Sequence, residues 1–287
     1  MNLNLATIRW LQVESTTKCN AWCAGCGRNK NGYELADGLE LADLTTDALE
    51  QACIQLPSLE VVQFCPTYGD PLAADNIMEQ VNVAKKYSKK IQLHTNGSLR
   101  NTDWWANLAA TLTNIEHDVW FTLDGLEGVH EIYRQGTFFN KVINNAEAFI
   151  NAGGHATWQF IPWAHNEHQI LDCIKLSQQL GFKKFKLINR VRPVPVARHY
   201  KTGEAYELKP WSRNEITNPL SFVRNHVELK NCMHLSIPSI YLNYNGKLSR
   251  CCRYNLKEMF DSAKDITDQS DKILNDSSDF CVYNCGS

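Results

Sequence analysis

The sequence predicts an α/β fold, a partial (β/α)6 barrel of the TIM type, followed by a small C-terminal α+β domain rich in cysteine. Short apolar, β-branched or aromatic runs alternate with longer amphipathic stretches up to about residue 190, and then the alternation stops. A complete eight-stranded barrel typically takes about 250 residues, so six βα units predict an incomplete one. The 11 cysteines are unevenly spread, with three in residues 19–26 and five in residues 232–285.

The expected strands are five to seven residues long and end near Gly, Pro, Asn or Asp. They are Arg9–Glu14, Leu59–Phe64, Lys90–His94, Asp118–Leu123, Ala156–Ile161 and Phe182–Ile188. The expected helices are Leu44–Leu56, Ala73–Tyr87, Asp103–Leu112, Phe139–Ala152 and Glu167–Leu180. In the first helix, Leu49, Ala52, Cys53 and Leu56 form a stripe at helical spacing, which indicates a core-facing side. Strands alternating with helices in this way predict a parallel sheet.

Three segments follow from these patterns. Residues 1–190 form the barrel, residues 191–231 form a proline-containing bridge, and residues 232–287 form the cysteine-bearing module. Within the module, Ser239–Tyr244 and Lys247–Cys252 flank an Asn-Gly pair, which predicts a hairpin with a tight turn.

Composition narrows the classes of function. The 287 residues are 44% hydrophobic and 21% charged, with a formal net charge of −2, so neither a nucleic acid nor an anionic membrane is an expected partner. The first residues, MNLNLATIRW, lack a signal peptide, and no run of about 18 apolar residues follows. We therefore expect a cytoplasmic protein, in which clustered cysteines are metal ligands or catalytic groups rather than disulfides.

Cys19, Cys23 and Cys26 form a C-x3-C-x2-C array directly after the first expected strand. Thiolates suit iron–sulfur clusters and zinc. Structural zinc normally takes four ligands, whereas this compact loop offers three and leaves one position vacant. A cluster with a vacant iron could bind a chelating ligand and deliver an electron to it. Zinc remains the alternative.

This loop and its place after the first strand resemble the radical S-adenosylmethionine (SAM) superfamily. The resemblance implies a [4Fe–4S] cluster on Cys19, Cys23 and Cys26, whose fourth iron is chelated by the amino and carboxylate groups of SAM. It also implies reductive cleavage of SAM to a 5′-deoxyadenosyl radical and a flavodoxin- or ferredoxin-type electron donor. The family usually has an aromatic residue before the third cysteine; here Gly25 stands there, and Trp22 is the candidate for the covering ring.

Four further segments resemble SAM-binding elements of that superfamily. Three of them follow expected strands, and the fourth comes next along the chain, in the family's order. The resemblance assigns the SAM ammonium to the turn Tyr68, Gly69 and Asp70, the methionyl part to Asn96, the ribose to Asp124 and the SAM carboxylate to Arg134. Arginine suits the last role because a guanidinium matches a carboxylate bidentately. Trp163 and Asn166 follow the fifth strand and are expected at the same mouth. No residue is assigned to act on the substrate itself.

The second cysteine group, Cys232, Cys251, Cys281 and Cys285, resembles the Twitch or SPASM type of auxiliary-cluster domain, and the single-cluster Twitch form is the closer match. The resemblance implies a second, auxiliary [4Fe–4S] cluster with every iron on a thiolate. Cys252 competes with Cys251 as a ligand. Four cysteines suit tetrahedral zinc equally well, so a zinc-stabilised tail is the alternative.

A fully ligated auxiliary cluster could carry an electron away from a substrate radical, which favours net oxidation. Two substrate classes compete: a small polar metabolite, and a peptide, as in maturation of ribosomally made peptides. Only about eight residues precede the first strand, without room for a peptide-recognition domain, and this favours the small metabolite. The alternative from another class is a zinc-stabilised, non-catalytic binding protein on the same fold.

Overall fold

The computed structural model describes residues 5–65, 67–113, 116–188, 194, 196–212 and 239–249. The chain divides into two compact units, each treated by itself below. Unit 1 draws on Met1–Lys18, Leu41–Gln92 and Lys230–Ser287, and unit 2 draws on Cys19–Glu40 and Leu93–Leu229. The predicted auxiliary ligands Cys232, Cys251, Cys281 and Cys285, with Cys252, lie outside the described residues.

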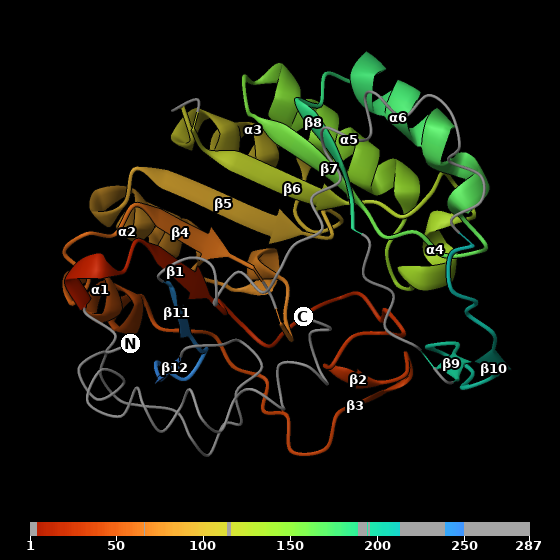
Figure 1. The fold of residues 1–287 in the computed structure, drawn as a ribbon, viewed down its shortest axis with the longest axis horizontal. Coiled ribbons are helices and arrows are strands. Elements are labelled where there is room, and N and C mark those ends of the chain that lie inside the picture. Colours follow the sequence, from red (N-terminus) through yellow and green to blue (C-terminus); the bar gives the residue numbers. More distant parts are fainter. Residues whose placement is uncertain are drawn as a thin grey trace. The chain divides into compact units, whose positions relative to one another are not determined.

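Unit 1 is built on a parallel core of strands (Figure 1). Its strands β1 (Trp10–Val13), β4 (Val61–Phe64), β11 (Ser239–Leu242) and β12 (Leu248–Ser249) are ordered β12-β11-β1-β4. β1 pairs in parallel with β4 on one side and β11 on the other, so that Val13 lies opposite both Phe64 and Leu242. The pairing of β11 with β1 is not predictable from the sequence pattern, because alternation reveals a strand but not its neighbour.

β11 and β12 form the expected hairpin. They pair antiparallel, with Tyr241 opposite Ser249, and the amide of Asn243 donates to the carbonyl of Lys247 at 2.8 Å. Gly246 has φ of 80°, a left-handed conformation that glycine adopts without strain. The prediction of a tight Asn-Gly turn is therefore confirmed.

Unit 2 continues the βα alternation. β5 (Lys90–Thr95) is divided between the units after Gln92, and β6 (Asp118–Thr122), β7 (Ala156–Phe160) and β8 (Lys184–Leu187) follow in the order β5-β6-β7-β8. β7 is parallel to both β6 and β8. The six strands expected from the sequence are all present, and the expected α/β fold class of successive βα units is confirmed.

The helices that follow the strands are α1 (Thr46–Ile54) and α2 (Ile77–Tyr87) in unit 1, and α3 (Thr102–Thr111), α5 (Phe139–Asn151) and α6 (Ile170–Gln179) in unit 2. Their bounds differ from the expected ones by at most four residues. Side-chain caps fix two starts: Thr45 accepts from the amide of Ala48 at 3.2 Å, and Asn101 accepts from that of Trp104 at 2.9 Å.

The sequence pattern did not predict the shortest elements, because two to four residues are too few for a period to register. They are η1 (Leu5–Thr7), β2 (Asn29–Lys30), β3 (Glu34–Leu35), η2 (Pro71–Ala73), α4 (His130–Tyr133), β9 (Ala197–Arg198) and β10 (Ala205–Tyr206). The short η3 (Glu167–Gln169) lies at the start of the helix expected over Glu167–Leu180. α4 matters most for the site, since it leads directly into Arg134.

An aromatic cluster holds α3 and α5 against β6 in unit 2. Trp105 is fully buried, and its ring lies 4.8 Å from that of Phe121 and 6.0 Å from that of Phe149. The indole Nε1 of Trp105 donates to the carbonyl of Leu99 at 3.1 Å, so the one polar atom of the ring is satisfied.

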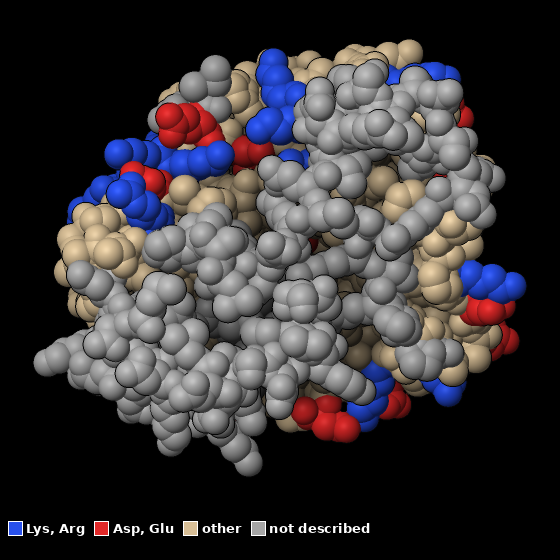
Figure 2. Space-filling model, in the orientation of Figure 1, with Lys and Arg blue, Asp and Glu red and all other residues tan. Residues whose placement is uncertain are grey.

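The face drawn in Figure 2 carries Lys and Arg side chains next to Asp and Glu side chains. Pairs of this kind include Lys86 with Glu50 at 2.7 Å and Arg9 with Glu60 at 2.6 Å, both in unit 1. Exposed ion pairs contribute little to stability, so the packing inside each unit matters more. Across the residues described, no helix has both the length and the apolar character needed to cross a membrane.

Replacing Trp105 with alanine should lower the free energy of unfolding by about 3–5 kcal/mol, since it opens a cavity in this cluster. The neighbouring Trp104 is only half-buried, and Trp104→Ala, the matched control, should cost about 1 kcal/mol. Urea denaturation followed by circular dichroism measures both. Equal losses in the two variants would show that the cluster around Trp105 is not the core of unit 2.

Candidate active site

The cysteine loop that follows β1 lies in unit 2. Cys23 is buried, and Cys19 and Cys26 are half-buried. The amide of Ala21 donates to Cys19 Sγ at 3.3 Å, and the amide of Arg28 donates to Cys26 Sγ at 3.4 Å. Such hydrogen bonds favour the charged thiolate form. Hydrogen bonds to ligand sulfurs also help to set the reduction potential of an iron–sulfur cluster. The loop is therefore suited to hold thiolate ligands.

Two predicted site residues reach these sulfurs from the loops after successive strands. Asn96, after β5, lies with Nδ2 3.7 Å from Cys19 Sγ and also donates to Asn20 Oδ1 at 3.0 Å. Arg134, after α4, lies with Nη1 3.6 Å from Cys23 Sγ. Unit 2 thus brings the first two cysteines together with Asn96 and Arg134.

Asp124 and Arg134 form a buried ion pair. Asp124 is fully buried, its Oδ2 accepts from Arg134 Nε at 2.6 Å, and its Oδ1 accepts from the amide of Ile161 at 2.7 Å. Burial raises the pKa of Asp124, while the charge of Arg134 and the bond from Ile161 oppose that shift. Burial tends to lower the pKa of Arg134, but Asp124 and Cys23 outweigh it and raise that pKa. The sequence predicted both residues at the site but not that they bind each other.

A second buried chain of hydrogen bonds fixes the loop between Asp124 and Arg134. The amide of Asp124 donates to His130 Nδ1 at 3.1 Å, so the ring proton resides on Nε2, which lies 2.9 Å from Thr137 Oγ1. Thr137 in turn donates to the carbonyl of Arg134 at 2.6 Å. His130 is fully buried, and burial lowers its pKa to about 3. The histidine is thus a neutral link that holds Asp124 and Arg134 at a fixed distance.

Asn166, expected at the same mouth, is also part of this scaffold. Its Nδ2 donates to the carbonyl of Asp124 at 3.0 Å, and its Oδ1 accepts from the amide of Trp163 at 2.7 Å. Asn166 is completely buried, so within unit 2 it positions the Asp124 loop against the loop after β7.

The ring beside Gly25 belongs to Tyr133 rather than Trp22. A Cβ atom at Gly25 would lie 3.0 Å from the phenol oxygen of Tyr133, so that side chain already occupies the space. Tyr133 packs on Trp163 with ring centroids 5.2 Å apart, and both join one buried cluster with Cys23. The ring of Trp22 instead lies under the guanidinium of Arg28, at 5.1 Å. Tyr133 directly precedes Arg134, and that position was the only sequence signal that could have identified it.

Burial raises the pKa of Cys23, and the nearby charge of Arg134 opposes this rise. A metal bound to the sulfur would add a larger positive charge and hold it as a thiolate. In the described part of the chain, no three His, Cys, Asp or Glu side chains converge closely enough to hold a single metal ion. A [4Fe–4S] cluster binds its cysteines through different irons, so the three thiols of this loop need not converge in that way.

The Tyr68–Asp70 turn lies in unit 1 and is described there. Gly69 packs so closely on the carbonyl of Thr16 that a Cβ atom would overlap it, which explains the glycine. The carboxylate of Asp70 accepts from the amide of Leu72 at 3.0 Å and caps η2, so this side chain serves its own turn. The amides of Tyr68 and Gly69 donate to the carboxylate of Glu14, a residue that sequence reasoning did not select.

The fold matches solved structures of SAM-binding proteins. Over 92% of this chain, with a TM-score of 0.63 and 14% identity, it is similar to the crystal structure of Streptococcus suis SuiB bound to S-adenosylmethionine. Over 65% of this chain, with a TM-score of 0.52 and 20% identity, it is similar to anSMEcpe with bound AdoMet. SuiB was also solved bound to the precursor peptide SuiA, and this structure matches with a TM-score of 0.61 and 13% identity.

The chain spans 66% of the SuiB chain and 51% of the anSMEcpe chain. No protein-family model matches the sequence, and no curated protein does. These likenesses support the expected fold class, a partial barrel of successive βα units.

Acidification should destabilise the protein through His130. Because its pKa falls from 6.5 to about 3 on folding, the neutral ring contributes stability that is present above about pH 6.5 and lost as the pH falls towards 3. The free energy of unfolding of the wild type, minus that of His130→Gln, should shrink by up to about 3 kcal/mol between pH 6.5 and pH 4. Urea titrations across this pH range measure the difference, and parallel pH profiles of the two proteins would contradict it.

Proposed function

We propose that this protein is a radical SAM enzyme that cleaves SAM reductively and abstracts hydrogen from a substrate. The observation that carries the proposal is the convergence of Asn96 and Arg134 on two sulfurs of the cysteine loop. When bound to Cys19, Cys23 and Cys26, a [4Fe–4S] cluster would supply the electron that cleaves SAM. The reducing conditions that such a cluster needs are those of the cytosol, with a flavodoxin- or ferredoxin-type protein as electron donor.

Each predicted site residue has a role in this proposal, and the contacts of Arg134 support its own. Arg134 would bind the SAM carboxylate, since its pair with Asp124 uses only Nε and leaves the end of the guanidinium directed towards Cys23. Asp124 would orient Arg134 as well as accept from the ribose. Asn96 would meet the methionyl part, and Tyr68, Gly69 and Asp70 would receive the ammonium.

The Tyr133 phenol and the Trp163 indole would exclude water beside the loop. Both side chains are buried, and Trp163 is 2% exposed. Cys232, Cys251, Cys281 and Cys285 are proposed to hold an auxiliary cluster of the Twitch type that accepts an electron from the substrate radical.

A peptide is the substrate class that the comparisons favour, because SuiB was solved with a precursor peptide and matches 92% of this chain. A small polar metabolite is the competing class. Deuterium transfer into 5′-deoxyadenosine separates the two when a deuterated cell extract is divided by size before assay. Transfer from the peptide fraction supports peptide maturation, and transfer from the small-molecule fraction supports oxidation of a metabolite.

The loop cysteines give the decisive variant. Replacing Cys19, Cys23 and Cys26 together with alanine should abolish 5′-deoxyadenosine formation and lower the iron content from about eight to about four per chain. Cys53→Ala/Cys173→Ala is the matched control: both side chains are buried, on α1 and α6, and this variant should keep its iron and its activity.

Two outcomes would overturn the proposal. One is 5′-deoxyadenosine formation by the triple variant under reduction. The other is a colourless wild-type protein that contains zinc after anaerobic purification, which would favour the non-catalytic binding protein instead.

A further inference from the structure

Glu14, at the end of β1, is a buried carboxylate surrounded by hydrogen-bond donors. It is fully buried, and three successive amides donate to it: Thr67 at 2.7 Å, Tyr68 at 3.2 Å and Gly69 at 2.9 Å. The hydroxyl of Tyr241, on β11, donates at 2.8 Å. All of these contacts lie within unit 1. Burial raises the pKa of Glu14 to about 7, against the opposing effect of these four bonds.

The three amides determine where the carbonyls of the turn point. In a planar trans peptide the N–H and the preceding C=O point in opposite directions. Because the amides of Tyr68 and Gly69 point at Glu14, the carbonyls of Thr67 and Tyr68 point away from it. Glu14 on one side of the turn therefore orients the carbonyls towards the other side. Carbonyl oxygens there suit an ammonium group, which is a hydrogen-bond donor.

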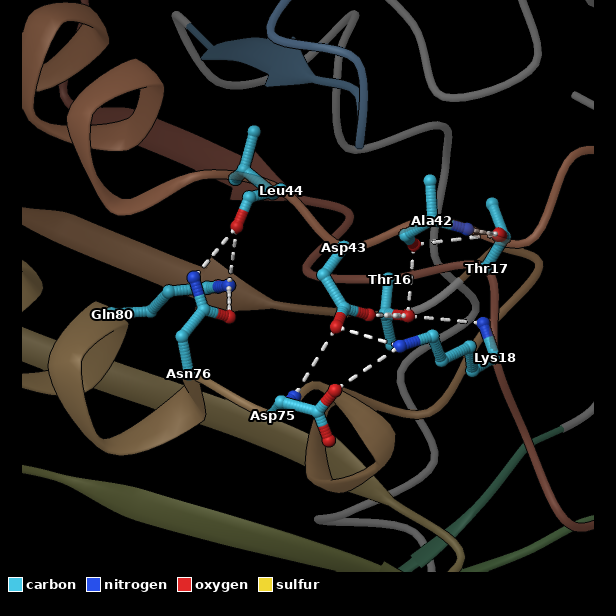
Figure 3. A network of polar contacts seen from close by, with 9 residues as sticks. All are labelled: Thr16, Thr17, Lys18, Ala42, Asp43, Leu44, Asp75, Asn76 and Gln80. Atoms are coloured by element: carbon cyan, nitrogen blue, oxygen red, sulfur yellow. Dashed lines mark hydrogen bonds and ion pairs between the residues drawn. The ribbon is translucent and has the colours of Figure 1, made fainter.

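The turn is also fastened to the segment that leads into the cysteine loop. The amide of Asp70 donates to the carbonyl of Lys18 at 2.8 Å, and Lys18 directly precedes Cys19 in the chain. Figure 3 shows how this segment is held: Asp43 accepts from Thr16 Oγ1 at 2.5 Å and from Lys18 Nζ at 2.8 Å. The segment between Glu14 and Cys19 is thus held by hydrogen bonds to Asp70 and to Asp43.

We propose that Glu14 is a positioning residue that holds the Thr67–Asp70 turn with its carbonyls ready to bind the ammonium of SAM. This inference rests on the proposed function. A carboxylate suits the task because its two oxygens offer about four acceptor sites for four donors. A glutamine in its place would turn an NH2 group towards amide donors and would leave part of the turn unheld.

Binding of two ligands to the anaerobically reconstituted protein tests the inference. SAM carries the ammonium, and 5′-methylthioadenosine lacks the amino-acid part. Glu14→Gln should raise the Kd for SAM by about 10- to 100-fold and change the Kd for methylthioadenosine by less than about twofold, with iron content unchanged. Gln12→Leu is the matched control, a buried residue of β1 that donates to the carbonyl of Cys65.

The control should bind both ligands as the wild type does. If Glu14→Gln fails to fold, Tyr241→Phe removes one donor and should raise the Kd for SAM alone, by about threefold. Equal weakening of both ligands, or an unchanged Kd for SAM, would overturn the inference while the proposed function stands. A wild type that binds no SAM would overturn both.

Discussion

The site in unit 2 depends on one buried carboxylate, that of Asp124. Its side chain binds Arg134 and the amide of Ile161, its own amide binds His130, and its carbonyl accepts from Asn166. A buried charge is costly unless it is paired and hydrogen-bonded, and here each oxygen has a partner. Arg134 is held by this pair and reaches Cys23, so the position of the guanidinium beside the cysteine loop follows from the burial of Asp124.

Unit 1 uses the same physical device at the end of β1. Glu14 is as deeply buried as Asp124, and its partners are backbone amides and a phenol rather than an arginine. Burial outweighs these hydrogen bonds and raises its pKa to about 7. An apolar side chain in its place would leave three buried amides without an acceptor, so the acid is best explained by the turn that it orients.

Much of the fold was predictable because strands and helices carry their periods in the sequence. The run Asp118–Leu123 contains β6, in which the apolar Val119 and Phe121 alternate with polar or amphipathic residues, although all five side chains of the strand are buried. Hairpin β11–β12 was predictable from its Asn-Gly pair. α4 was not, because four residues are too short to show a helical period.

The sequence by itself determined the three thiols of the cysteine loop, the α/β alternation and the polar residues after successive strands. Only the tertiary structure decided that Asp124 binds Arg134, that Tyr133 fills the space beside Gly25, and that Glu14 holds a turn 53 to 55 residues away and is held by Tyr241, 227 residues away. The reason is physical. A period within one segment tells which side of a strand is buried, whereas the partner of a buried polar group is set by the segments that folding brings to it.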